Sequence, residues 1–320
     1  MSFKVLQPGL LSLLQDLGRF GQHAIGLTSG GPLDTEAFLW ANRILHNSAN
    51  ACAIEVSFGG LQLQAKTDTY LCVTGANLGL SINGIDKALW TSHKIVNGDD
   101  IKLSYSSQGC RSYLAVAGGF QVIPSFGSTA TVVREKIGGL KGAKLATNDS
   151  LACVRTPHLA RQALAEADWP LYGPQDNSSN QTYTRLRLLP SYQHQQFDSA
   201  TRARFFHGQY SVTDRSDRMG MRLEGPAVAC PSSQMLSEGI CLGAVQVPAD
   251  GQPIVLLNDR QTIGGYPKIG AVMASDTACL AQLRPGDKVV FKAVDLYQAQ
   301  TINTLAQIKF DAIKLLYLKD

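Results

Sequence analysis

Short apolar segments rich in β-branched residues alternate with glycine-rich turns along most of the chain. Seven of these segments stand out, at residues 70–74, 101–103, 113–117, 186–189, 243–247, 254–257 and 289–291. Apolar runs of this length, separated by glycine turns at this spacing, are typical of β-barrels and β-sandwiches. The pattern therefore predicts a mostly β protein.

Helical patterns are few and short. We predict one helix from a cap at Asp34 to about Leu45, with its apolar residues on one face. A second is expected to begin at Pro157 and to end before Trp169. A third is expected to begin at a cap on Ser275 or Asp276 and to run through residue 283. Residues 295–316 also have helical composition, although their apolar pattern is uneven.

A similar sequence motif occurs near the end of each half of the chain. Residues 97–103 (Asn-Gly-Asp-Asp-Ile-Lys-Leu) and 285–291 (Pro-Gly-Asp-Lys-Val-Val-Phe) both place a Gly-Asp turn before an alternating strand. Between them, the polar and aperiodic stretch at 172–184 has the composition of a linker. We therefore expect two related β-barrel halves, residues 1–180 and residues 181–320.

Charge and composition exclude several classes of protein. Lysine and arginine number 29 and aspartate and glutamate 25, a net charge of +4, with no basic run, so a nucleic acid partner is not expected. The chain begins without an apolar signal core and has no apolar stretch near the ~18 residues that a membrane span needs. Its seven scattered cysteines fit buried thiols in a reducing compartment, which predicts a cytoplasmic protein.

The usual signatures of self-contained catalysis are missing. There is no Gly-x-x-x-x-Gly-Lys-Ser/Thr phosphate loop, no His-Glu-x-x-His zinc motif and no Gly-x-Ser-x-Gly elbow, and no two histidines have the spacing of a local metal pair. We expect no metal site. What stands out instead are glycine-rich loops with Asp and Arg, at residues 15–21 with 30–34, 214–222, and 246–267.

These loops have two interpretations. Glycine lets backbone amides approach a ligand, and arginine offers a planar fork for carboxylate or carbonyl groups. Alternatively, the loops are tight turns in which Asp caps backbone amides and Arg pairs with Asp. The functional interpretation is favoured for residues 259–267, because polar side chains that follow a buried strand at the mouth of a barrel are well placed to line a pocket.

Taken in order along the chain, the sequence motifs in these loops resemble those of a known family. The matching runs include Gln15-Asp16-Leu17-Gly18-Arg19, Asp217-Arg218-Met219-Gly220, Ser237-Glu238-Gly239, Asp259-Arg260-Gln261-Thr262 and Gly264-Gly265-Tyr266-Pro267. They resemble the biotin-dependent carboxyltransferase-like proteins, also called allophanate hydrolase subunit 2 or KipA-like proteins, whose members include the C subunit of 5-oxoprolinase. The resemblance covers residues 4–291, and it departs where Met221 stands in place of a frequent tyrosine.

The resemblance implies a fold and an activity. It implies two cyclophilin-like β-barrel domains, residues 1–180 and 181–320, in the C subunit of an ATP-dependent 5-oxoprolinase, a hydrolase that opens the lactam of 5-oxoproline to L-glutamate. The expected partners are the 5-oxoprolinase A subunit and a KipI-like B subunit; this chain alone would bind no cofactor, and the assembled complex would use ATP. Two alternatives stay open, a carboxyltransferase component of a urea carboxylase-type system and a KipA-like regulatory protein that binds a KipI-like kinase inhibitor.

The same phrases supply the candidate site. The predicted catalytic residues are Arg218, Arg222, Asp259 and Arg260. The predicted substrate-binding residues are Gln246, Gln261, Thr262, Gly264, Gly265, Tyr266, Asp16, Arg19 and Asp34.

Overall fold

The computed structural model describes residues 1–170, 183–229 and 235–318, and the chain divides into two compact units. The first unit is made of Met1–Gln22, Ser29–Pro170 and Lys314–Asp320, and the second of His23–Thr28 and Leu171–Ile313. Each unit thus includes a short segment from beyond its main stretch of sequence. The expected boundary at residue 180 and most of the expected linker lie outside the described residues, so that boundary stays a prediction.

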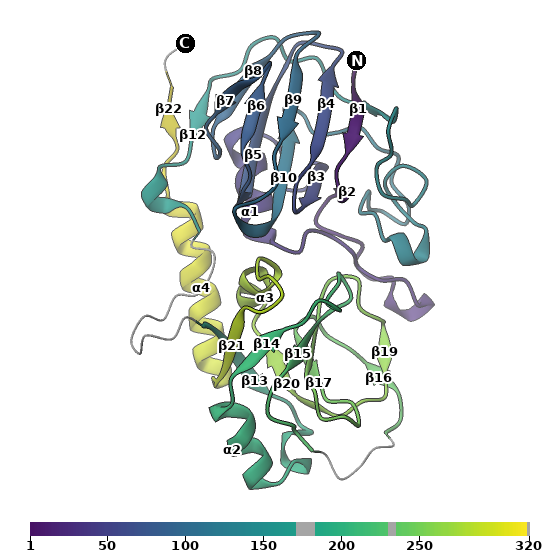
Figure 1. Ribbon diagram of the computed structural model, residues 1–320, viewed down its shortest axis with the longest axis vertical. Helices are drawn as coiled ribbons and strands as arrows, with labels where there is room; N and C mark the ends of the chain where they lie inside the picture. Colours follow the sequence, from purple (N-terminus) through teal and green to yellow (C-terminus); the bar gives the residue numbers. More distant parts are fainter. Residues whose placement is uncertain (171–182, 230–234, 319–320) are drawn as a thin grey trace. The chain divides into compact units, whose positions relative to one another are not determined.

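The first unit contains two large antiparallel sheets, which Figure 1 shows as two layers. The six-stranded sheet has the order β11-β1-β4-β9-β6-β7, and the five-stranded sheet has the order β2-β3-β10-β5-β8. The strands of the first sheet are β1 (Ser2–Pro8), β4 (Leu61–Ala65), β6 (Leu80–Ile82), β7 (Ile85–Lys87), β9 (Asp100–Leu103) and β11 (Ser150–Ala152). Those of the second are β2 (Leu11–Gln15), β3 (Ala53–Ser57), β5 (Thr69–Asn77), β8 (Ser92–Ile95) and β10 (Gln108–Val116).

The five-stranded sheet forms the centre of this unit. Strands β3, β5 and β10 are buried on nearly every residue, whereas β4 in the other sheet buries alternate residues. The second face of the central sheet is covered by α1 (Thr35–Ile44), which packs on β5 and β10. Asp34 caps this helix by accepting a hydrogen bond from the amide of Ala37 at 3.0 Å, as expected.

The second unit contains a closed barrel of seven strands in the order β13-β20-β17-β18-β15-β14-β21. Its strands are β13 (Thr184–Pro190), β14 (Tyr210–Val212), β15 (Gly220–Glu224), β17 (Ala244–Gln246), β18 (Ile254–Leu256), β20 (Lys268–Val272) and β21 (Lys288–Ala293). A two-stranded sheet of β16 (Glu238–Gly239) and β19 (Ile263–Gly264) belongs to the same unit. The mostly β prediction is confirmed; the closed barrel lies in the second unit, while in the first the described strands form two large sheets and a separate two-stranded one.

Helices α2 (Ser199–His207), α3 (Ala274–Ala281) and α4 (Leu296–Ala312) complete the second unit. Helix α4 begins with a capping box of Asp295 and Gln298. Helix α3 forms, but the expected cap is wrong: the helix begins at Ala274 after Met273, so Ser275 and Asp276 lie within its first turn. The Asp276 carboxylate binds the backbone and guanidinium of Arg187 instead. The short 3-10 helices are η1 (His23–Ile25), η2 (Val133–Glu135), η3 (Glu166–Asp168) and η4 (His194–Gln196). No helix in the described part of the chain is both long and apolar enough to cross a bilayer.

The prediction of a helix that begins at Pro157 and ends before Trp169 is wrong. This stretch instead forms β12 (Gln162–Ala163), which pairs with β22 (Leu316–Tyr317), followed by η3. The Ser92 hydroxyl exchanges hydrogen bonds with the backbone of Gln162, and Trp169 stacks on Trp90 with ring centroids 5.7 Å apart. These contacts with distant residues outweigh the weak local preference for a helix.

The repeated Gly-Asp phrase forms the same turn in both units. The Asp99 carboxylate accepts from the amide of Val96 at 2.8 Å, and Asp287 accepts from the amide of Arg284 at 2.8 Å. The glycine before each aspartate has a left-handed φ, +101° at Gly98 and +94° at Gly286, which explains the residue type. Each turn leads into a strand, β9 in the first unit and β21 in the second, as the sequence predicts.

Candidate functional site

The site begins with the register of three neighbouring barrel strands. Arg222 on β15 lies directly opposite Ile254 on β18, which in turn lies opposite Gln246 on β17. Residues opposite each other in antiparallel strands project from the same face of a sheet. The adjacent row, made of Met221, Val255 and Val245, is buried inside the barrel. Arg222, Ile254 and Gln246 therefore project from the outer face.

A pocket of about 130 Å³ lies over this row. Its floor is apolar, formed by Ile254 and Leu256 with Gly220, and Ile240 closes one side. The remaining lining residues are polar or come from the surrounding loops: Asp217, Met219, Arg222, Gln246, Gln261 and Tyr266. A second hollow beside it shares Arg222, Ile254 and Tyr266. Four of the predicted site residues are thus brought together in one pocket: Arg222, Gln246, Gln261 and Tyr266.

Two hydrogen-bond donors in the pocket lack partners among the described residues. The exposed guanidinium of Arg222 makes no hydrogen bond or ion pair there. Gln246 is only 6% exposed, and its amide nitrogen Nε2 also has no partner in that part of the chain. Leaving a buried donor unpaired costs about 1–3 kcal/mol. A buried, unpaired amide at the wall of a pocket is a reason to expect a polar ligand there.

Gly264 is required by its closeness to Gln246. A Cβ atom at this position would lie 2.7 Å from the Gln246 amide nitrogen and 2.5 Å from Cδ1 of Ile240. The neighbouring Gly265 would place a Cβ 3.0 Å from the carbonyl oxygen of Met235. The Thr262 carbonyl accepts a hydrogen bond from the amide of Ile240 at 3.1 Å, which joins the segments that carry the lining residues Ile240 and Gln261. Thr262, Gly264 and Gly265 are not among the residues that line the pocket, and their predicted contacts with substrate stay predictions.

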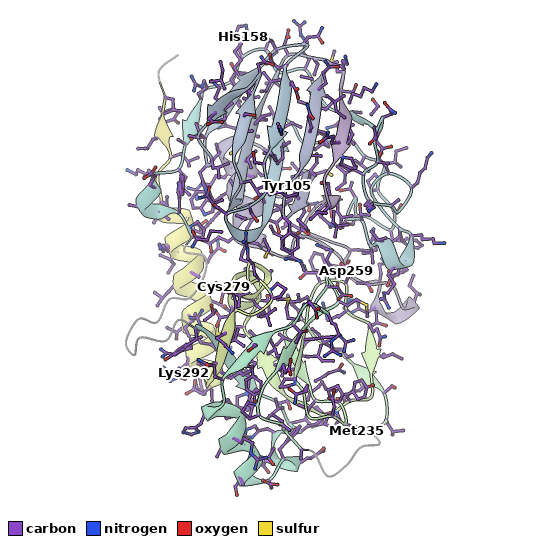
Figure 2. All side chains as sticks on the ribbon, in the orientation of Figure 1. Tyr105, His158, Met235, Asp259, Cys279 and Lys292 are labelled. Atoms are coloured by element: carbon purple, nitrogen blue, oxygen red, sulfur yellow. The ribbon has the colours of Figure 1, made fainter. Side chains whose placement is uncertain are left out.

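Arg218 and Asp259 form a buried ion pair close to the pocket. Nε and Nη2 of Arg218 donate to the two carboxylate oxygens of Asp259, each at 2.9 Å, and both side chains are almost fully buried. The amide of Asp259, labelled in Figure 2, also donates to the carbonyl of Arg218 at 3.0 Å. The pair therefore joins the loop before β15 to the loop after β18. This geometry positions the pocket loops, and a catalytic role for either residue stays a prediction.

Arg260 is occupied by backbone carbonyls. Its guanidinium donates to the carbonyl oxygens of Ile240 at 3.1 Å and Leu257 at 3.2 Å. Burial lowers the pKa of Arg260 below its usual value. In this arrangement Arg260 holds the loop that carries Ile240, and its predicted contact with substrate stays a prediction.

Sequence reasoning missed a polar cluster on the next strand. Lys268 on β20 lies opposite Gln246 and forms an ion pair with Glu238. Glu238 also accepts hydrogen bonds from the Tyr192 hydroxyl and from the Gln193 amide, the latter at 2.7 Å. The hydrogen bond from Lys268 lowers the pKa of Glu238. The phrase at residues 237–239 carries the signal for Glu238, whereas no local signal points to Tyr192 or Gln193.

The three predicted site residues of the first unit make hydrogen bonds that stabilise its loops and helix α1. Asp16 accepts hydrogen bonds from the Ser128 hydroxyl and from two backbone amides. Arg19, fully buried, donates to the carbonyl of Ala130 at 3.0 Å and to two other carbonyls. Asp34 caps α1. These residues belong to the first unit and the pocket to the second, and their predicted substrate contacts remain predictions.

The cysteines only partly match the expectation of buried thiols. Cys52, Cys72, Cys110 and Cys153 are buried, and burial raises the pKa of the Cys52 thiol to about 12. Cys241 is exposed, which contradicts that expectation, Cys279 is half-buried, and Cys230 lies outside the described residues. No group of three or more His, Cys, Asp or Glu side chains in residues 1–170, 183–229 and 235–318 is arranged to hold a metal ion.

Comparison with known proteins identifies the family. The carboxyltransferase domain, subdomain A and B, matches residues 25–293. The chain belongs to this carboxyltransferase domain family. The match spans both units and includes every residue that lines the pocket. The resemblance expected from the sequence phrases is confirmed.

Individual members of the carboxyltransferase domain family match over most of the chain. It is 34% identical over 302 residues to the C subunit of the Haemophilus influenzae 5-oxoprolinase, covering 94% of each chain. It is 35% identical over 299 residues to the C subunit of the Escherichia coli 5-oxoprolinase, covering 92% of each. The solved structure of the Kluyveromyces lactis urea carboxylase superposes with a TM-score of 0.88 at 25% identity. That alignment covers all of this chain but only 30% of the larger protein.

Proposed function

We propose that this chain is the C subunit of an ATP-dependent 5-oxoprolinase built from several subunits, which opens the lactam of 5-oxoproline to L-glutamate. The observation that carries the proposal is the end-to-end match to two proteins named as 5-oxoprolinase C subunits, at 34% and 35% identity. The name of those relatives implies partner subunits, and we propose the A subunit of 5-oxoprolinase together with a KipI-like B subunit in the cytoplasm.

The pocket in the second unit is the proposed substrate site. It is small, its floor is apolar, and its polar lining residues are an arginine, an aspartate, two glutamines and a tyrosine. This combination suits a small, partly apolar molecule with an anionic group. A lactam is stabilised by resonance, so opening it at a useful rate requires activation of the amide. Because the sequence lacks a standard phosphate loop, we assign the use of ATP to the assembled complex rather than to this chain alone.

Reconstitution tests this proposal directly. The chain is co-expressed with the A and B subunits from the same genome, and glutamate release from 5-oxoproline is measured with and without ATP. We expect release by the complex of all three proteins, dependent on ATP, and none by this chain alone. A matched preparation that lacks only this chain is the control. Full activity in that control, or rapid hydrolysis by the isolated chain, would refute the proposed role.

A second candidate function is the carboxyltransferase component of a urea carboxylase-type system. The observation in its favour is the likeness of the whole chain to part of the K. lactis urea carboxylase, at a TM-score of 0.88. The same reconstituted complex distinguishes the two functions when urea with bicarbonate replaces 5-oxoproline. Consumption of ATP that depends on urea and not on 5-oxoproline would favour this second function.

A further inference from the structure

We propose that the barrel pocket recognises 5-oxoproline by its two ends, with the Arg222 guanidinium on the carboxylate and the Gln246 carboxamide on the lactam edge. The inference rests on the proposed function and deepens it, because it assigns the discrimination between related small molecules to two particular side chains. Its starting point is the row formed by Arg222, Ile254 and Gln246.

The spacing of this row suits a ligand of that size. Arg222 and Gln246 are separated by one intervening strand, and two strand spacings place their Cα atoms about 10 Å apart. Both side chains line the same pocket, and Ile254 lies between them in the register of the strands. The apolar floor of Ile254 and Leu256 would lie under the ring methylenes. A five-membered ring with one substituent fills a cavity of about 130 Å³ better than a longer molecule would.

The lactam edge is chemically complementary to a carboxamide. A five-membered ring locks its amide in the cis form, so the N–H and the C=O point to the same side. The carboxamide of Gln246 presents one donor and one acceptor side by side, and can therefore form two hydrogen bonds with that edge. Its amide nitrogen has no partner among the described residues and is closed off from water, so pairing it requires rotation about the last side-chain torsion. Because Gly264 has no Cβ, its backbone can lie directly against this amide.

The carboxylate end fits Arg222. The guanidinium offers a planar fork that matches a carboxylate with two parallel hydrogen bonds. Asp217 is the acidic residue in the pocket lining, and its Oδ1 accepts hydrogen bonds from the amides of Met219 at 2.8 Å and Gly220 at 3.1 Å. One oxygen of that carboxylate is therefore committed to its own turn. Arg222 is the cation in the pocket lining and the natural partner for an anionic ligand.

The two-ended arrangement makes a specific prediction about analogues. 2-Pyrrolidinone keeps the lactam edge but has no carboxylate, and L-proline keeps the carboxylate but has no lactam carbonyl. 2-Pyrrolidinone therefore loses the contacts of the carboxylate end, and L-proline loses the carbonyl acceptor of the lactam edge. We expect the wild-type complex to bind 5-oxoproline at least about tenfold more tightly than either, since tenfold corresponds to only about 1.4 kcal/mol.

Binding of these three molecules to variants tests the assignment. Dissociation constants are measured on the reconstituted complex by calorimetry and by competition in ligand-observed NMR. Arg222→Met should abolish the preference over 2-pyrrolidinone while retaining the preference over L-proline. Gln246→Met, which keeps the side-chain length, should do the reverse. Arg215→Met removes a cation that lines only the neighbouring hollow, and as the matched control it should leave all three constants unchanged.

A second variant protects the test against misfolding at the buried position. Gln246→Glu keeps the shape and the acceptor but loses the amide donor, and it should also lose the preference over L-proline. Melting temperatures identify any variant that is not folded. Unchanged preferences in folded Arg222 and Gln246 variants would overturn the inference, as would an equal weakening of all three ligands.

The outcomes also separate this inference from the proposed function. If the wild-type complex releases glutamate from 5-oxoproline while the Arg222 and Gln246 variants keep wild-type preferences, the function stands and the two-ended recognition is wrong. If the wild-type complex neither binds nor turns over 5-oxoproline, both are wrong. Loss of one preference in each variant, in the predicted direction, supports both.

Discussion

The buried pair of Arg218 and Asp259 gives the sharpest prediction about stability. The Asp259 carboxylate accepts two hydrogen bonds of 2.9 Å from the Arg218 guanidinium. Asp259→Asn keeps the shape of this side chain but removes its negative charge. Breaking a buried ion pair by removing one partner typically costs about 3–5 kcal/mol, because it leaves the other charge buried. Since asparagine retains one acceptor oxygen, we expect the lower end, about 3 kcal/mol.

Thermal and urea unfolding of the full chain measure this cost. For a folding unit of the size of the second one, 1 kcal/mol shifts the melting temperature by about 2–4 °C, so Asp259→Asn should lower the transition of that unit by about 6–12 °C. Asp68→Asn is the control, because the Asp68–Arg155 pair is exposed and asparagine can still accept from the Asn97 amide, so the melting temperature should fall much less than in Asp259→Asn. Removing both charges in an Arg218→Met, Asp259→Leu double variant should recover part of the loss. A melting temperature for Asp259→Asn within about 1 °C of wild type would refute the argument.

Three further predictions follow from the same geometry. Gly264→Ala should lower both stability, by about 1–3 kcal/mol, and 5-oxoproline binding, because the new Cβ would lie 2.7 Å from the Gln246 amide; unchanged binding would contradict this. Arg260→Ala should reduce the activity of the complex about tenfold or more and should also lower its melting temperature, because the carbonyl of Ile240 loses its hydrogen-bond donor. Reduced activity at an unchanged melting temperature would instead place the guanidinium on the substrate. Burial lowers the pKa of His93, so the folded state favours the neutral ring, and the stability of the protein should fall as the pH drops from about 7.5 to about 5.5. The melting temperature of His93→Gln should fall less steeply over this range than that of the wild type, and an equally steep fall would contradict this.

Much of the secondary structure follows from local sequence patterns. Each of the seven apolar segments lies within a strand or extends beyond it by at most one residue at either end, and the Gly-Asp motifs form the same turn in both units. The cap at Asp34 begins α1, and Asp295 begins α4. These features depend on residues within a few positions of one another, such as an aspartate and the amide three residues away. Local patterns are therefore sufficient to predict them.

Contacts between distant residues decided the features that sequence reasoning missed. The segment after Pro157 is extended because Ser92 and Trp90 contact it, and the Asp276 carboxylate, expected to cap α3, binds Arg187 instead. None of these three partners is near in the sequence. A local pattern carries no information about such partners, and their hydrogen bonds and burial exceed the small differences in helix propensity.

The candidate site shows the same division. The sequence alone identified the polar loops, the family they resemble, and Arg222, Gln246, Gln261 and Tyr266 as candidate ligand contacts. Only the tertiary structure decided which of the candidates share a pocket, because that depends on strand register, and a slip of one residue would send Arg222 to the barrel interior. Burial likewise gave Arg218 and Arg260 internal partners, since a guanidinium removed from water must find its hydrogen bonds within the protein.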